Sequence, residues 1–330
     1  DDFHSIKSNE ILKLAAYLLD YIPGNIHIVI LTRSDPALAF SRLRSQHQLV
    51  ELRSSDLSFS ANDISILFNK RLKLGLSVDD VYSLESKTEG WIAGLQLTAL
   101  SMQGREDISE FIQGIKGDNR YIMDYLMEEV LKTQTDEIKE FLLKTSILEQ
   151  MSAPLCNDVL NRNDSQLILE TLEKNNMFVI PLDEERDWYR YHHLFAELLK
   201  HRLHLRDKST IILLHNKAIE WFNNNSMPLL AIRHAIETGN FEKSIQLLGE
   251  IVETMWQNGQ HSAILKYGDI LPDEIIKKNA DFSLYYSCIL IIAGKDTRAE
   301  TFLSSAELLA KRIIDDKNSA KEDTRYYKQL

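Results

Sequence analysis

The 330-residue sequence contains little of what marks several classes of protein. It has only two cysteines, Cys156 and Cys288, and no cysteine–histidine spacing typical of a zinc site. A reduced, cytoplasmic setting is therefore expected. No signal peptide is present, and the longest apolar run, residues 287–293, is too short to cross a membrane. We therefore predict no membrane partner.

Positive charge is also scarce. The 38 Lys and Arg residues are outnumbered by 49 Asp and Glu residues, which gives a net charge of −11. This balance disfavours nucleic-acid binding by the chain as a whole. The sequence has no phosphate loop of the form G-x-x-x-x-G-K-[ST], and no Ser/His/Asp or Cys/His set can be assembled with any specificity. Enzymatic activity thus has no support from the residues alone.

The stretch Tyr189–Leu199 organises what is present. Its pattern predicts a short strand that leads directly into an amphipathic helix, with two adjacent histidines, His192 and His193, at the helix entrance. From residue types alone, one histidine would be exposed and the other packed against the wing. The apolar face of the helix comprises Leu194, Phe195, Leu198, Leu199 and Leu203.

Before this stretch the chain mixes strand and helix patterns. A helix is predicted over Ser8–Tyr21, and the β-branched run Ile26–Leu31 is typical of a buried parallel strand. The loop Thr32–Pro36 follows at the carboxyl end of that strand, where open α/β sheets bind ligands. A second strand is predicted at Leu49–Arg53. This alternation indicates the C-terminal part of an α/β nucleotide-binding domain over residues 1–56.

A helical domain is predicted over residues 57–118. Ser60 and Asp63 have the spacing of a capping box at its start. Gly90 and Gly94 would each cost about 1 kcal/mol in a helix, so we expect them to permit close approach of another helix or of a ligand. The expected helices cover residues 61–73, 78–87 and 90–103.

Residues 119–206 have the order of elements of a winged helix. Helices over 120–132, 136–144, 153–160 and 164–175 precede two strands, at 177–182 and 188–191, and a final helix. The predicted wing is acidic, which opposes contact with phosphate, so we interpret the module as one that packs on protein. Its acidic residues are Asp183, Glu184, Glu185 and Asp187.

From residue 207 to 330 every pattern is helical. Paired helices at 229–237 with 241–255, and at 282–293 with 298–312, indicate stacked helical hairpins. The predicted fold class is therefore mainly α: the end of a P-loop α/β domain, a helical domain, a winged helix, and α-helical-hairpin (TPR-like) repeats that form an arm and the start of a sensor.

Four motifs occur in order: Asp1–His4, Leu31–Pro36, Thr88–Leu97 and Tyr191–Leu199. Together they resemble the large MalT-type, LuxR-family ATP-dependent transcriptional regulators, which belong to the signal-transducing (STAND) class of P-loop NTPases. The resemblance is strong over residues 1–205 and extends to the remainder in architecture only. It implies that the chain is an internal fragment of a ligand-responsive regulator.

The resemblance also implies roles for single residues. Asp1 and Asp2 resemble the end of a Walker B strand, where carboxylates hold Mg²⁺ and orient a catalytic water. Arg33 resembles a sensor arginine that reports the γ-phosphate, a role that suits its fork of N–H donors. From residue types alone, Asp1 and Asp2 could equally be a frayed terminus, and Arg33 a surface ion-pair partner.

Gly90 and Trp91 lie in a segment that resembles the one near the adenine of the bound nucleotide. His192 resembles the winged-helix histidine that contacts the β-phosphate of ADP and holds a closed state. Judged by residue type alone, Trp91 is a packing residue, and the two histidines keep their structural interpretation.

For the parent protein, the resemblance implies a slow ATPase switch that uses ATP, ADP and Mg²⁺, with no cofactor bound to the fragment. The implied partners are a small-molecule inducer or regulatory protein at the helical repeats, further copies of the chain on activation, and DNA. DNA would bind only through a helix-turn-helix that these 330 residues lack. The alternative function is a helical-repeat scaffold that binds a protein partner.

Overall fold

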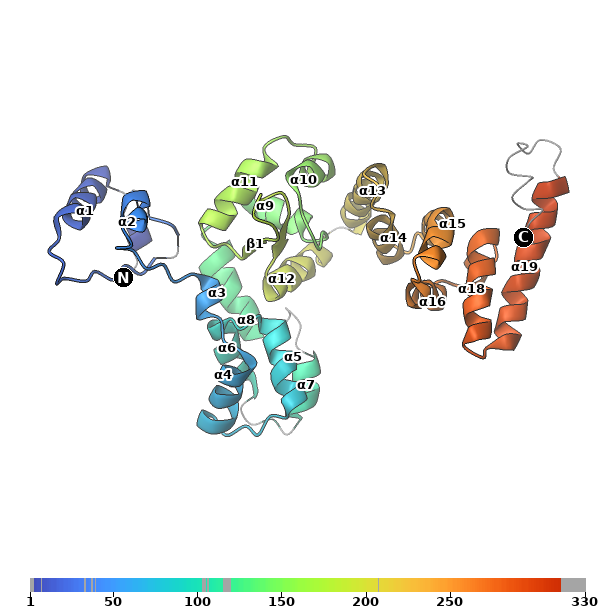
Figure 1. The fold of residues 1–330 in the computed structure, drawn as a ribbon, viewed down its shortest axis with the longest axis horizontal. Helices are drawn as coiled ribbons and strands as arrows, with labels where there is room; N and C mark the ends of the chain where they lie inside the picture. The colour runs from blue at the N-terminus through green and yellow to red at the C-terminus, as the bar shows by residue number, and fades with distance from the viewer. Residues whose placement is uncertain are drawn as a thin grey trace. The chain divides into compact units, whose positions relative to one another are not determined.

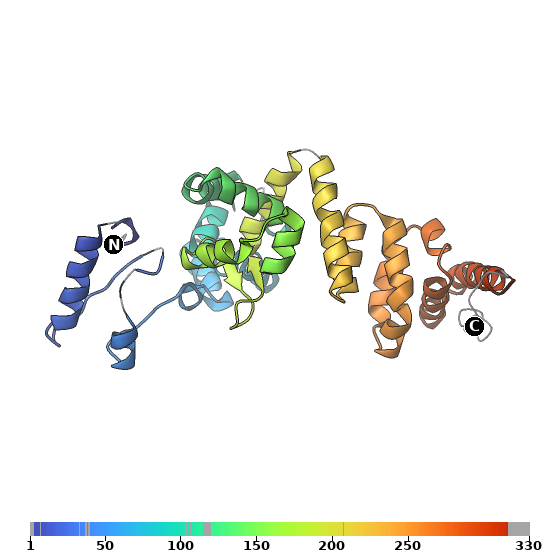
Figure 2. The ribbon, with the colours of Figure 1, turned by 90° about the horizontal axis from the view of Figure 1, so that it is seen from above.

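The computed structural model describes residues 3–6, 8–32, 34–36, 38, 40–102, 105, 107–114, 120–206 and 208–315. The chain divides into two compact units, Asp1–Lys208 and Ser209–Leu330, shown from blue to olive and from yellow to red in Figures 1 and 2. The mainly α fold class and the winged helix are confirmed. None of the described helices combines the length and apolar character needed to cross a membrane.

The first part of unit 1 forms helices without a sheet. Its elements are the 3₁₀-helix η1 (Phe3–Ser5) and the α-helices α1 (Asn9–Tyr21), α2 (Ser41–Ser45) and α3 (Ser54–Leu57). The strands predicted at Ile26–Leu31 and Leu49–Arg53 are not formed, although both segments are described, so that prediction is wrong for this structure. Neither segment pairs with another strand among the described residues.

The helical domain follows the predicted pattern closely. The capping box is confirmed: the side chains of Ser60 and Asp63 each accept a hydrogen bond from the other residue's backbone N–H. A second capping box, Ser77 with Asp80, begins another helix. The elements are α4 (Ala61–Ser65), the π-helix η2 (Ile66–Arg71), α5 (Val78–Thr88), α6 (Ile92–Met102) and α7 (Ile108–Gly114).

The winged helix combines five α-helices, a π-helix and a two-stranded antiparallel sheet. Val179 pairs with Tyr191 in that sheet. Leu198 and Leu199 are fully buried, as predicted, with the rest of their apolar face. The elements are α8 (Arg120–Tyr125), η3 (Leu126–Leu131), α9 (Asp136–Thr145), α10 (Ala153–Leu160), α11 (Ser165–Lys174), β1 (Val179–Pro181), β2 (Tyr189–Tyr191) and α12 (His193–His204).

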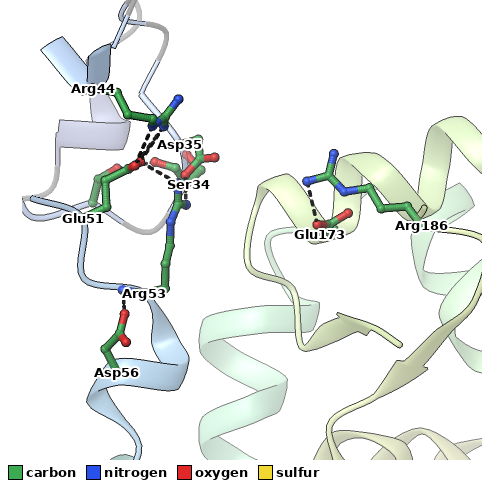
Figure 3. Close-up of polar contacts among 9 residues, drawn as sticks. Ser34, Asp35, Arg44, Glu51, Arg53, Asp56, Glu173 and Arg186 are labelled. Carbon is green, nitrogen blue, oxygen red and sulfur yellow. Dashed lines mark hydrogen bonds and ion pairs between the residues drawn. The ribbon is translucent and has the colours of Figure 1, made fainter. Parts of the chain in front are cut away.

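The acidic wing between β1 and β2 is organised by contacts within the winged helix. The carboxylate of Asp183 accepts hydrogen bonds from the backbone N–H groups of Asp187 and Trp188, at 2.8 and 3.0 Å. Arg186 forms an ion pair with Glu173 of α11 at 3.1 Å (Figure 3). Charged side chains of the wing therefore stabilise the wing's own turn and its contact with α11.

Unit 2 consists of successive helices. Both predicted helix pairs form: α14 packs against α15, and α18 against α19 (Figures 1 and 2). Helix α15 also packs against α18, which links the two pairs. The helices that unit 2 contains are α13 (Lys208–Asn224, entered from the last residue of unit 1), α14 (Pro228–Glu237), α15 (Phe241–Gln257), α16 (His261–Ile270), α17 (Asp273–Ile276), α18 (Ala280–Ile292) and α19 (Asp296–Asp315).

Candidate functional site

The candidate site is the joint between the α5–α6 turn, Thr88–Trp91, and the start of α12 in the winged helix. Two consecutive residues of the turn, Glu89 and Gly90, adopt left-handed conformations, with φ of 49° and 71°. This pair ends α5 and redirects the chain into α6. The joint therefore depends on backbone conformations that most side chains disfavour.

Gly90 is also required by the space around it. A Cβ atom at Gly90 would lie 2.4 Å from the carbonyl oxygen of Phe59 and 2.7 Å from its nitrogen. The Phe59 N–H donates a 2.9 Å hydrogen bond to the carbonyl of Gly90. The close approach predicted for Gly90 is thus to the backbone of Phe59. The predicted start of this helix was two residues early, since α6 begins at Ile92 and Gly90 lies in the preceding turn.

Gly94, inside α6, permits a different approach. A Cβ atom there would lie 2.5 Å from the ring of Trp91 and 3.3 Å from the side chain of Leu194. The ring of Trp91 also contacts Tyr125 and Phe178, at centroid distances of 5.6 and 5.2 Å. In this structure, Trp91 is a packing residue at the centre of the joint.

A bidentate ion pair connects the two sides of the joint. Nη1 and Nη2 of Arg190, in β2, donate to Oε1 and Oε2 of Glu89 at 2.8 and 2.7 Å. The backbone N–H of His193 donates to the same carboxylate at 2.8 Å. Burial alone would raise the pKa of Glu89, but the hydrogen bonds from Arg190 and from the backbone N–H of His193, together with the charge of Arg190, lower it overall. Glu89 is therefore ionised, and the pair is a fixed contact.

His192 is the buried histidine of the adjacent pair, with 8% of its surface exposed, while His193 is exposed. Nε2 of His192 lies 3.0 Å from the carbonyl oxygen of Thr88. Because a carbonyl oxygen can only accept, Nε2 carries the hydrogen of this bond. Nδ1 is buried and has no hydrogen-bond partner among the described residues. It is a polar atom that the protein fold leaves unsatisfied.

The surroundings of His192 favour its neutral form. Burial lowers its pKa below the ordinary value of about 6.5, and the charge of Glu89 and the bond to Thr88 offset this only in part. Phe178 and Trp91 meet the imidazole edge to face at 5.6 and 6.0 Å. At neutral pH, Nδ1 therefore offers a lone pair in an aromatic surrounding.

The structure brings three of the predicted site residues together: Gly90, Trp91 and His192. Asp1, Asp2 and Arg33 lie outside the described residues.

Near Arg33 in sequence, a small ion-pair network is described (Figure 3). The carboxylate of Glu51 contacts Arg44 and Arg53, each at 2.9 Å, and Arg53 also pairs with Asp35. These groups satisfy one another at the surface, where such pairs contribute little to stability.

The sequence did not predict the contact between Glu89 and Arg190. Glu89 lies in the motif Thr88–Leu97 and Arg190 in the stretch Tyr189–Leu199, but the two residues are 101 positions apart. A helix-capping residue followed by glycine identifies a turn. A single sequence does not show which charged residue of another element contacts that turn.

Comparison with known proteins bears on the same joint. Residues 127–211, which include Arg190 and His192, match the model of the MalT winged helix domain. The chain is 30% identical over 267 residues to the HTH-type transcriptional regulator MalT of Vibrio parahaemolyticus. The alignment covers 80% of this chain and 30% of that protein. The chain is therefore similar to MalT over most of its own length. MalT of Yersinia pestis is 28% identical to this chain over 310 residues, which are 93% of this chain and 34% of that protein.

Two further matches have names that do not describe a transcriptional regulator. The serine/threonine-protein kinase PknK of Mycobacterium tuberculosis is 28% identical over 315 residues, 93% of this chain and 28% of the kinase. A STAND protein with a tetratricopeptide repeat sensor from Pyrococcus horikoshii aligns with a TM-score of 0.39 and 16% identity, over 83% of this chain and 40% of that one. This chain spans about a third or less of the length of these curated relatives.

Proposed function

We propose that this chain is the switch segment of a longer, ATP-dependent and ligand-responsive transcriptional regulator of the STAND class. The observation that carries the proposal is the buried, unpartnered Nδ1 of His192 at the joint between the helical domain and the winged helix. A buried polar atom without a partner costs free energy, so a ligand that satisfies it stabilises the joint in this arrangement. A nucleotide phosphate is the proposed ligand.

The chemistry of the joint fits an anionic group under one condition. The bond to Thr88 keeps a hydrogen on Nε2, so Nδ1 can donate to a phosphate oxygen only when the ring is protonated. Glu89 lies close enough to favour the charged ring. We therefore expect nucleotide binding at His192 to be accompanied by uptake of one proton and to tighten as the pH falls below neutral.

The remaining parts of the proposal extend beyond the joint. Residues 1–56 would be the end of a P-loop domain in which Asp1 and Asp2 hold Mg²⁺ and Arg33 meets the γ-phosphate. The helical hairpins of unit 2 would bind an inducer or a regulatory protein. Self-association and DNA binding would follow on activation, the latter through a helix-turn-helix in another part of the regulator.

The relatives support a regulatory role for this segment. It is shared by proteins named as transcriptional regulators and by one named as a protein kinase. A segment common to proteins with such different outputs is expected to control the output without performing it.

The test is the substitution His192→Ala in the longer regulator, with the exposed neighbour in His193→Ala as the matched control. A charged histidine hydrogen-bonded to phosphate is worth about 1.5–3 kcal/mol, so ADP retention should fall roughly ten- to a hundredfold in His192→Ala. Reporter output without inducer should rise, because the closed state loses that contact. His193→Ala should change both quantities much less.

Normal ADP retention and normal basal output in a folded His192→Ala protein would contradict the proposal. A second measurement concerns the 330-residue chain alone. Since its sequence has no phosphate loop, calorimetry should detect negligible binding of ATP–Mg²⁺. Micromolar affinity would show that the nucleotide contacts have been misassigned.

A further inference from the structure

We propose that His215, His234 and Glu237 form a binding site for a divalent transition metal, for which Zn²⁺ is the probe. The site lies between α13 and α14 of unit 2 and shares no residue with the joint at His192. His215 belongs to α13, and His234 and Glu237 belong to α14, one helical turn apart. One ligand atom from each residue can be chosen so that all three lie within 4.8 Å of one another.

The distances between the ligand atoms are close to those that a metal needs. Nδ1 of His215 lies 2.8 Å from Nδ1 of His234 and 3.8 Å from Oε2 of Glu237. Ligands about 2.0–2.1 Å from a tetrahedral Zn²⁺ are about 3.3 Å from one another. Changes of roughly half an ångström at these two contacts, with rotation of the exposed Glu237 carboxylate toward His234, would therefore seat the ion.

The ligand set is one that zinc uses. Two imidazoles and one carboxylate supply three ligands and leave the fourth position to water or another ligand. Neutral imidazole also suits cobalt, nickel and copper, so the class of ion is a first-row divalent metal. The carboxylate of Glu237 would reduce the net charge of the ion together with its ligands, whereas two neutral imidazoles would leave that charge unchanged.

Burial and stacking restrict the positions of the two histidine rings. Both rings are buried, with 5% and 6% of His215 and His234 exposed. The ring of Phe222 stacks on His234 at 5.4 Å and an interplanar angle of 14°, which limits how that imidazole can turn. Glu237 is half exposed, so an ion can reach the site from solvent on its side.

The competing interpretation is a pair of histidines that share one hydrogen. Two neutral rings with facing Nδ1 atoms can form a single N–H···N bond, with no role for Glu237. The two interpretations differ in one consequence. A metal would join α13 to α14 through ligands from both helices, so it would stabilise the folded chain as its concentration rises.

The experiment is calorimetric titration of the metal-free 330-residue chain with Zn²⁺, followed by thermal melts. We expect one ion per chain with micromolar or tighter affinity, and a rise in the Tm of unit 2 of roughly 5–10 °C when free Zn²⁺ exceeds the Kd about a hundredfold. Binding should be lost in His215→Ala and His234→Ala. It should weaken at least about tenfold in Glu237→Ala.

Glu220→Ala is the matched control, since Glu220 is an exposed carboxylate on α13 outside the site. Its Zn²⁺ affinity should equal that of the native chain. Because the buried histidine variants could fail to fold, X-ray absorption of the native chain loaded with one Zn²⁺ provides a second readout, and two imidazoles and one carboxylate are expected around the ion. Absence of saturable binding to the native chain, unchanged affinity in Glu237→Ala, or a ligand shell without imidazole would each overturn the proposal.

Discussion

Two regions of unit 1 have similar sequence patterns and different outcomes. In α12 of the winged helix, Leu198 and Leu199 are fully buried. In α1, Leu14 and Leu18 occupy comparable apolar positions but are 68% and 55% exposed, and no residue of that helix is buried. Helical periodicity thus specifies which face is apolar, and only a packed neighbour turns that face into a core.

The strands show the same contrast. Val179–Pro181 and Tyr189–Tyr191 pair because a short wing brings one strand directly to the other. Ile26–Leu31 is richer in β-branched residues, yet it forms no strand and Val29 is 81% exposed. A strand is a property of a pair, so a favourable composition without a partner does not produce one.

The largest expected effect tests this difference in burial. Leu198→Ala and Leu199→Ala should each destabilise unit 1 by roughly 2–5 kcal/mol, because truncating a buried leucine removes transfer free energy and leaves a cavity. The matched substitutions Leu14→Ala and Leu18→Ala in α1 should change stability by less than about 0.5 kcal/mol. Thermal and chemical denaturation measure both sets. Equal losses in the two helices would show that α1 has a packing partner.

A second, smaller effect compares two ion pairs. Glu89–Arg190 is bidentate, and its side chains are 22% and 34% exposed, whereas the side chains of Asp35 and Arg53 are 57% and 50% exposed. A double-mutant cycle with alanine should give a coupling energy of about 1–3 kcal/mol for the first pair and about 0–1 kcal/mol for the second. The salt dependence should be weaker for Glu89–Arg190, since partly buried charges are screened less. Similar coupling in both pairs would remove the distinction between the two regions.

Most of the fold could be predicted because its determinants are local. The capping box of Ser60 and Asp63, and the apolar face that contains Leu198, are short-range patterns that the structure retains. The helix pair α14–α15 likewise follows from two amphipathic segments joined by a short turn. Prediction failed at Ile26–Leu31, where the outcome depends on a partner strand that the sequence pattern alone cannot supply.

The candidate site was predictable only in part. His192 and Gly90 lie in recognisable motifs, and the motif order pointed to both. The contact of Glu89 with Arg190 and that of His215 with His234 link different elements, so their geometry depends on tertiary packing. Residue spacing along one chain carries no information about such pairings unless the fold is already known.

The smallest effect concerns the titration of His192. Its pKa in the folded chain is lowered by burial, with partial opposition from Glu89 and Thr88, whereas the unfolded chain should titrate near 6.5. The unfolded state therefore binds the proton more tightly. Stability from this residue is fully present above about pH 6.5 and is lost as the pH falls through the folded pKa.

Unfolding free energies measured between about pH 7 and pH 5 should accordingly fall, with a contribution from His192 of at most about 1.4 kcal/mol per pH unit. His192→Gln should flatten the curve in this window, because glutamine cannot take up the proton. His27→Gln makes the same substitution at an exposed histidine in the first region of unit 1 and serves as the control. If His192→Gln and His27→Gln gave the same pH dependence, the joint would hold no buried neutral imidazole. A nucleotide phosphate could then bind at His192 without uptake of a proton.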